Sequence, residues 1–356
     1  MAERAGRPTA KTASDAGARI DADRLHREIT IVDGLVFWSD GTADTLRQGN
    51  VAAVNLTVCG FQADFARCCD EMAIWADRLS RPDGPWHPVL AAADVAIARE
   101  LGKVGLVMGW QNMRPIEDKL ERLAFFHKLG VRVMQLTYNE RNFIGDGCLE
   151  PQNGGLTALG RDAVREMNRL GIAVDVSHVG DRTTLDAIDI SSKPVLVTHA
   201  NARAIHPAVR NRSDEVLKAV AAAGGTIGVV IHASMCWDGD PRRRPDLTDV
   251  VRQLDYLVKL VGIEHVALGS DFPAANDLSP LKAVVSATLT RYPGFIGEFA
   301  KAFGNDMATR YPVDCGSPAA LSALTHALVA QGWSAADIEA FYGGNLLRVL
   351  ADIWSG

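Results

Sequence analysis

The sequence predicts an α/β protein built as a (β/α)8 barrel of the TIM type, with additional helices near its C-terminal end. Short apolar runs rich in β-branched residues recur from residue 29 onward, and amphipathic helical patterns separate them. Polar side chains recur where these runs end, which is typical of the carboxyl-terminal mouth of a parallel barrel. These observations together favour a barrel that carries its chemistry at one end.

The apolar runs supply eight candidate strands, the number that closes a barrel of this kind. They lie at residues 29–36, 51–58, 104–109, 131–137, 172–177, 195–198, 226–231 and 265–269. An open doubly wound sheet is the alternative, because periodicity alone cannot distinguish a closed sheet from an open one.

The segments between the strands predict helices on the outside of the barrel and long connections at its mouth. Amphipathic patterns cover residues 156–170, 214–223 and 247–260. Connections rich in Gly, Asn, Asp and Pro cover residues 139–155, 201–213, 233–245 and 272–281. Residues 319–355 predict two further helices packed on the outside. We expect a flexible arm at residues 1–20 and one barrel domain over residues 21–356.

The composition favours an enzyme that acts on small molecules. The formal net charge of −6 gives no basic surface for nucleic acid or for an anionic membrane, and no run of eighteen apolar residues predicts a transmembrane helix. The six cysteines are widely spaced without a CxxC pair, so we expect reduced thiols and a cytoplasmic protein. The expected partner is a small-molecule substrate, and a homodimer is left open.

Two histidines follow successive strands and predict a metal site. His178 and His199 are separated by one helical crossover, which places them on neighbouring strands of the barrel. Neutral imidazoles are good ligands for zinc. The alternative is that each histidine only caps its strand. Gln111 and His232 also follow strands, and we expect them as a weak and a reserve ligand.

Other polar residues at the mouth predict catalytic and binding roles. Asp271 follows the last strand, where a carboxylate can act as a general base, or alternatively as the N-cap of the next segment. Arg210 lies in the loop before a helix with Ser213 as its expected N-cap and could bind a substrate carboxylate, with Arg212 close enough to compete. Tyr138 could donate to a developing oxyanion or simply cover the barrel end, and Asn139 beside it is expected to contact substrate.

At these residues the chain resembles the membrane (renal) dipeptidase family of zinc metallopeptidases, within the amidohydrolase-like barrels. The resemblance extends from residue 29 to the C-terminal end and rests on segments that recur in order: GVRVMQLTYNERN, DVSHVG, VTHAN, VRNRSDEVL, ALGSDF and YGGNLLRVL. It implies a two-metal site that cleaves dipeptides. His178 and His199 match the histidines of the second metal, Arg210 the substrate-carboxylate arginine, and Asp271 the final aspartate.

The chain departs from the family at the first metal. The family's first strand ends in Asp-Gly-His-x-Asp, whose His and Asp bind that metal, and Leu35 and Phe37 stand at these positions here. Gln111 replaces the bridging glutamate, and Tyr138 replaces the substrate-facing histidine. Leucine and phenylalanine cannot bind zinc, so a complete binuclear centre is not expected.

The sequence therefore predicts a dipeptidase-like hydrolase that uses one metal, most simply zinc, to cleave an amide bond of a small carboxylate-bearing substrate. Two alternatives stay open. One is a metal-dependent lyase, isomerase or hydrolase of a non-peptide molecule. The other is a barrel that binds a small molecule without catalysis.

Overall fold

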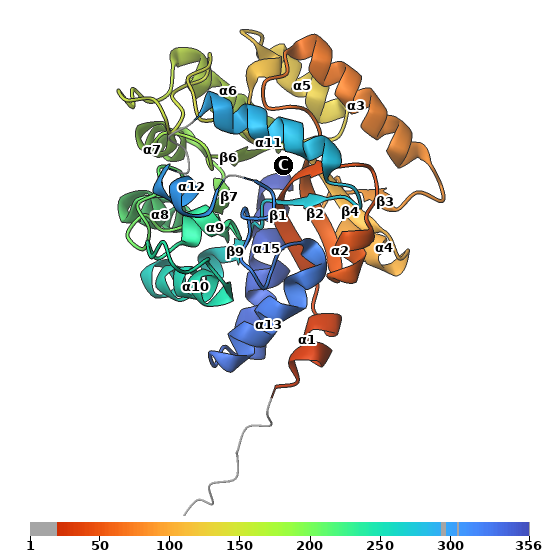
Figure 1. Cartoon of the computed structure of the whole chain (residues 1–356). Coiled ribbons are helices and arrows are strands. Elements are labelled where there is room, and N and C mark those ends of the chain that lie inside the picture. The colour runs from red at the N-terminus through yellow and green to blue at the C-terminus, as the bar shows by residue number, and fades with distance from the viewer. Residues whose placement is uncertain (1–19, 293–296, 305, 356) are drawn as a thin grey trace, which may run out of the picture.

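The structure is a computed structural model that describes residues 20–292, 297–304 and 306–355. Residues 1–19, almost all of the predicted N-terminal arm, lie outside the described residues. The described chain curls a parallel sheet into a barrel and covers it with helices (Figure 1). The division into arm and barrel domain stays a prediction.

The strands form a curled, entirely parallel sheet. In chain order they are β1 (Ile31–Ser39), β2 (Val51–Thr57), β3 (Trp86–Pro88), β4 (Val104–Trp110), β5 (Val131–Gln135), β6 (Ala173–Asp175), β7 (Leu196–Ala200), β8 (Thr226–Val229), β9 (Val266–Leu268) and β10 (Phe272–Ala274). The order across the sheet is β10-β1-β2-β4-β5-β6-β7-β8-β9, with β3 a short extra strand against β4. Every one of the eight runs predicted from the sequence overlaps a strand.

The sheet closes through its last segment. β9 and β10 belong to one extended run interrupted only at residues 269–271, and this run pairs with β8 through β9 and with β1 through β10. β9 and β10 together therefore form the eighth stave of the barrel. The predicted (β/α)8 barrel is confirmed, and the open doubly wound sheet is excluded.

Helices surround the barrel and follow its strands. Those before the C-terminal region are α1 (Ala22–Glu28), α2 (Asp44–Gln48), α3 (Phe65–Ser80), α4 (Asp94–Glu100), α5 (Glu121–Lys128), α6 (Ala158–Leu170), α7 (Asp181–Ile190), α8 (Asp214–Ala222), α9 (Ala233–Cys236), α10 (Leu247–Val261), α11 (Ser279–Arg291) and α12 (Gly297–Phe303). The three predicted helices correspond to α6, α8 and α10. The predicted N-cap Ser213 accepts from the Val216 amide at 3.4 Å.

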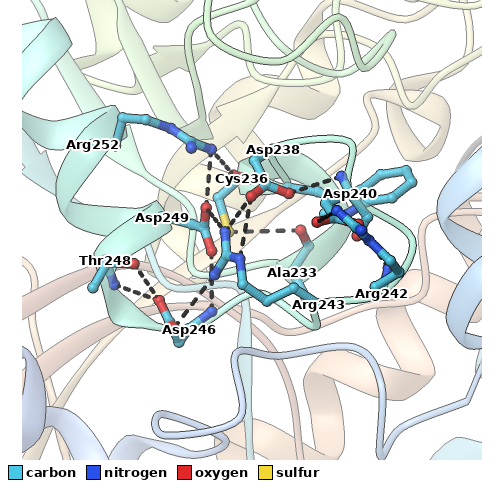
Figure 2. A network of polar contacts seen from close by, with 11 residues as sticks. Ala233, Cys236, Asp238, Asp240, Arg242, Arg243, Asp246, Thr248, Asp249 and Arg252 are labelled. Atoms are coloured by element: carbon cyan, nitrogen blue, oxygen red, sulfur yellow. Dashed lines mark hydrogen bonds and ion pairs between the residues drawn. The ribbon is translucent and has the colours of Figure 1, made fainter.

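A charged network fixes the connection between α9 and α10, one of the predicted loops at the mouth. Figure 2 shows Arg243 between Asp238, Asp246 and Asp249, with Arg252 also pairing with Asp249. Asp246 and Asp249 form a capping box that begins α10. The loop is thus anchored to the helix that follows it.

The C-terminal helices divide between the side and the end of the barrel. They are α13 (Leu321–Ala330), α14 (Ala335–Glu339) and α15 (Asn345–Trp354), with a π-helical turn, η4 (Ala340–Gly344), joining the last two. α13 packs outside against α1 and α10. Leu346, Val349 and Ile353 of α15 pack with inward residues from the first halves of the strands. The expectation that both helices lie on the outside was therefore wrong for α15, which covers the amino-terminal end of the barrel.

Backbone approaches backbone inside the barrel. Three glycines surround the carbonyl oxygen of Thr198: a Cβ added at Gly34, Gly228 or Gly269 would lie 2.9, 2.0 or 1.8 Å from it. These distances are below any van der Waals contact, so only hydrogen fits at these positions. The strands that carry the site are consequently packed closer than side chains would permit.

Candidate active site

A cavity of about 580 Å³ opens at the carboxyl ends of the strands. α3 and α11 contribute side chains to its outer wall, and α11 crosses over the strand ends in Figure 1. Its inner wall includes Phe37, Gln111, Tyr138, His178, Arg210, His232, Asp271 and Arg310. Most of the predicted site residues are therefore brought to one place.

His178 and His199 lie side by side, as the two-strand arrangement predicts. Their Nε2 atoms are 2.9 Å apart and both residues are buried. His178 follows β6 and lines the cavity, while His199 lies in β7 behind it. The two rings therefore converge through their Nε2 atoms.

Hydrogen bonds to the other ring nitrogens fix the tautomers. His178 Nδ1 lies 2.7 Å from Asn139 Oδ1, which only accepts, so Nδ1 carries the proton. The Thr198 hydroxyl donates to Asp175 Oδ2 at 2.7 Å, and its oxygen therefore accepts from His199 Nδ1 at 2.9 Å. Both Nε2 atoms are left with lone pairs that face one another, an arrangement that a shared cation would stabilise.

Asp175, the last residue of β6, orients the two histidines through the residues that precede them. Its carboxylate accepts from the backbone amides and the hydroxyls of both Ser177 and Thr198, the residues that precede His178 and His199. Burial raises the pKa of Asp175, and these four hydrogen bonds oppose the rise. Asp175 thus acts through its neighbours to orient the histidines.

The histidine pair is neutral. Burial lowers the pKa of His178 and of His199 well below the usual value, and the nearby Arg210 lowers both further. The neutral imidazole is the form that binds a metal ion.

Asp271 stands on a strained backbone at the cavity wall. Its φ is 57°, in the left-handed region that non-glycine residues rarely adopt. Oδ2 lies 3.0 Å from Arg310 Nη2, and Tyr311 donates to the Asp271 carbonyl. Burial raises the pKa of Asp271, opposed by Arg310 and Arg210. A carboxylate of raised pKa suits a group that accepts and returns a proton. The alternative N-cap role is not observed, because β10 follows.

Asp33 supports Asp271 from inside the barrel. Its Oδ1 accepts from the amides of Ser270 at 2.9 Å and Leu35 at 3.1 Å, and its Oδ2 accepts from the Ser270 hydroxyl. Burial raises the pKa of Asp33 to about 6. This acid holds the residue before Asp271, as Asp175 holds the residues before the histidines.

Tyr138 and Asn139 support His178. The Tyr138 ring stacks on His178 and on Phe61, with centroid distances of 4.2 Å in both cases. Tyr138 lines the cavity, and burial raises its pKa, so its hydroxyl keeps its proton and can donate. Asn139, expected to contact substrate, is instead fully buried against His178 and does not line the cavity.

The two predicted arginines are more buried than a loop position suggests. Arg210 donates to the carbonyls of Ser177 and His199, and it reaches the cavity wall. Arg212 donates to Val179 and Thr184 and does not line the cavity. Arg210 is therefore the better placed of the two to meet a substrate.

The weaker ligand candidates do not join the histidine pair. Gln111 donates from Nε2 to the Thr57 hydroxyl at 3.0 Å. His232 Nδ1 lies 2.8 Å from the Ser234 hydroxyl. Burial lowers the pKa of His232, with Arg310 and Arg210 adding to the effect. Both residues line the cavity as neutral groups.

The donor set suits no more than part of a metal site. Within residues 20–292, 297–304 and 306–355, no three His, Cys, Asp or Glu side chains are grouped to hold an ion. Leu35 and Phe37 offer no donor atoms, so the first site of a binuclear centre does not fit. His178 and His199 fit two ligands of one ion. Their 2.9 Å separation would open slightly, because two zinc-bound nitrogens in a tetrahedral site lie roughly 3.3 Å apart.

Several residues of the site were not predicted from the sequence. Asp33 and Asp175 were detectable as acids inside otherwise apolar strands, because a buried carboxylate is rare unless it organises neighbours. Arg310 and Tyr311 follow no strand and lie outside the segments that carry the family resemblance. Their contact with Asp271 depends on tertiary structure alone.

Comparison with known proteins agrees with this geometry. Residues 8–293 match the family model described as membrane dipeptidase, peptidase family M19. A Klebsiella pneumoniae protein described as "Uncharacterized protein in pqqA 5'region" is 28% identical over 291 residues, which are 80% of this chain and 95% of the relative. Dipeptidase tcpJ of Claviceps purpurea is 32% identical over 231 residues, which are 62% of this chain and 52% of that dipeptidase.

A solved structure supports the same assignment. An amidohydrolase from Pseudomonas aeruginosa is 28% identical and superposes with a TM-score of 0.81, with 95% of this chain and all of that chain covered. The chain spans about half the length of the Claviceps dipeptidase but the full length of this amidohydrolase. Fold and family match agree, and the chain belongs to the membrane dipeptidase family of metallopeptidases.

Proposed function

We propose that the protein is a dipeptidase-like hydrolase that cleaves an amide or peptide bond of a small, carboxylate-bearing substrate and holds at most one metal ion. One observation carries the proposal: His178 Nε2 lies 2.9 Å from His199 Nε2, and His178 lines the cavity that also holds Asp271. Family membership supports the reaction class.

Charge at the cavity supports an anionic substrate. Among the described residues that line it, five are arginines and three are carboxylates, an excess of two positive charges in a chain whose formal net charge is −6. Such a surface attracts a carboxylate. Arg210, which lines the cavity, would hold that carboxylate.

The residues divide the chemistry among themselves. His178 and His199 would hold the ion, which when bound supplies a Lewis acid that polarises the substrate carbonyl. Asp271 would take a proton from the attacking water and return it to the leaving nitrogen, for which its raised pKa is suited. The Tyr138 hydroxyl, beside His178, would donate to the substrate.

The compartment is a separate proposal. All six cysteines are free, which supports a reducing environment and hence a cytoplasmic protein. In the part of the chain that the structure describes, every helix is too short or too polar to cross a bilayer.

Metal analysis joined to a substrate panel tests the function. Protein prepared with zinc, cobalt or manganese should contain no more than one ion per chain and should hydrolyse at least one member of a panel of dipeptides and N-acyl amino acids. His178→Ala should lose both the ion and turnover, and Asp271→Asn should lose turnover alone. His326→Ala, a surface variant, is the control. Metal-loaded protein that cleaves no amide while converting a non-peptide substrate would replace the proposal with a lyase, isomerase or other hydrolase.

A further inference from the structure

Arg310 is a largely buried arginine at the cavity, and it lies outside the segments that carry the family resemblance. Nη2 pairs with Asp271 Oδ2 at 3.0 Å, and Nε donates to the Tyr311 hydroxyl at 3.2 Å. The side chain is 19% exposed and lines the cavity. Nη1 makes no hydrogen bond to any residue that the structure describes. Two contacts therefore fix the guanidinium, while its Nη1 hydrogens remain free for a bound molecule.

The face of this guanidinium lies over Phe37. The Arg310 Cζ atom is 4.9 Å from the centre of the Phe37 ring, a cation–π distance. Phe37 stands where the family's first strand supplies a carboxylate ligand to the first metal, and Leu35 stands where it supplies a histidine. One of these two positions, Phe37, thus supports an organic cation here.

Asp271 determines what Arg310 can reach. A group that transfers protons must lie within hydrogen-bond distance of the reacting atoms. Nη2 already contacts the Asp271 carboxylate, and Nη1 is joined to Nη2 through a single carbon. A substrate bound for proton transfer by Asp271 would therefore lie close to the Arg310 guanidinium, which lines the same cavity.

We propose that Arg310 takes the place of the missing first cation and stabilises the negative charge that develops on the substrate carbonyl oxygen during cleavage. The inference rests on the proposed hydrolase function. The inference also explains why the first-metal ligands are missing. A metal dication at that position would be repelled by the Arg310 guanidinium that pairs with Asp271.

The step balances with water as the only co-reactant. A water oxygen forms a bond to the carbonyl carbon as Asp271 accepts its proton, and the C=O π pair moves to the oxygen, beside Arg310. The pair then returns to re-form C=O as the C–N bond breaks, and the leaving nitrogen takes the proton from Asp271. Arg310 donates hydrogen bonds throughout and keeps all of its protons.

Kinetics of Arg310→Met test the catalytic role. Loss of an oxyanion donor should lower kcat by roughly 10²–10³-fold with KM changed less than threefold, and Arg310→Lys should retain part of the rate. Arg122→Met is a matched control: Arg122 also pairs with a carboxylate, Glu117 at 2.7 Å, and stacks on a ring, Phe65 at 4.0 Å, but lies outside the cavity lining. It should stay within twofold of wild type.

Two kinetic outcomes overturn the role. Unchanged kcat in Arg310→Met does so, and so does a rise in KM alone, which would make Arg310 a ground-state carboxylate receptor. If Arg310→Met fails to fold because Asp271 is left unpaired, Arg310→Gln keeps an N–H for Asp271 and takes its place in the assay.

Zinc stoichiometry tests the position without any substrate. Calorimetric titration and elemental analysis should give at most one zinc for wild type and for Leu35→His/Phe37→Asp, in which Arg310 is retained. Leu35→His/Phe37→Asp/Arg310→Met should bind one zinc more. Two zinc ions in wild type, or no gain in the triple variant, overturn the inference. The zinc titration needs no turnover. An inactive wild type would therefore refute the proposed function, while the titration would still show whether Arg310 excludes the first metal.

Discussion

The Tyr311 hydroxyl donates a 2.7 Å hydrogen bond to the backbone carbonyl of Asp271, the residue whose φ is 57°. Tyr311 is buried and its ring packs at 4.7 Å from that of Phe272. A strained conformation persists only where its surroundings enforce it. Tyr311 therefore positions the Asp271 backbone, and through it the carboxylate at the cavity wall.

Tyr311→Phe should separate this positioning from packing, since it removes only the hydroxyl. We expect kcat to fall roughly tenfold and the free energy of unfolding to fall by about 2 kcal/mol, because the hydroxyl both donates to the Asp271 carbonyl and accepts from Arg310 Nε. Steady-state kinetics and chemical denaturation measure the two effects. Tyr256→Phe loses a 2.7 Å bond to Asp214 on the outer helices and should leave kcat unchanged. Equal kcat in the two variants would contradict the positioning role.

Thr198→Val should weaken metal binding without removing a ligand. The valine keeps the shape of the threonine but cannot accept from His199 Nδ1. We expect zinc affinity to fall by roughly 10–100-fold, as is usual when a partner of a ligating histidine is lost. Competition with a chelating dye measures it. Thr45→Val, at a buried hydroxyl with no hydrogen-bond partner among the described residues, should leave the zinc affinity unchanged.

Asp33→Asn should change how stability depends on pH. Burial raises the pKa of Asp33 from 3.8 to about 6 in the folded protein, so the native state favours the protonated acid. Its stabilising contribution is present below pH 4 and is lost as pH rises through 6. The variant should therefore gain stability relative to wild type between pH 4 and 7, by at most about 3 kcal/mol. If the difference in unfolding free energy between Asp33→Asn and wild type stayed constant over this pH range, the pKa of Asp33 would not be raised in the folded protein.

Gly269→Ala should unfold the barrel or destabilise it by more than about 3 kcal/mol, because its Cβ would lie 1.8 Å from the Thr198 carbonyl oxygen. Thermal unfolding of the purified variant measures this. Gly316→Ala adds the same methyl group in open space and should change the melting temperature little. A stable Gly269→Ala protein would mean that β7 and β9 can separate.

The sequence predicted the barrel because its signals are local. Each strand is a short apolar run, and the side chain just after it points toward the common mouth, so His178, His199 and Asp271 could be grouped before any contact was known. The π-helical turn η4 and the place of α15 were not predictable in this way, since both depend on what the helix packs against.

The sequence predicted the positions of the site residues better than it predicted what each residue contacts. Asn139 was expected at the substrate, and it is instead buried with its side chain against His178. Arg310 lies 39 residues after Asp271, and no periodicity connects the two. Contacts of this kind are decided by the folded chain rather than by neighbours in sequence.

The glycines around the Thr198 carbonyl have a consequence for how this protein can evolve. His199 is the next residue, so any side chain that forces Thr198 outward should also displace this proposed ligand. At the mouth, Leu35 and Phe37 stand where the family resemblance implies ligands of one metal. The positions least open to drift are instead Gly34, Gly228 and Gly269, which carry no functional group at all. A saturation library should reveal the active site's tightest constraint at residues that never meet a substrate.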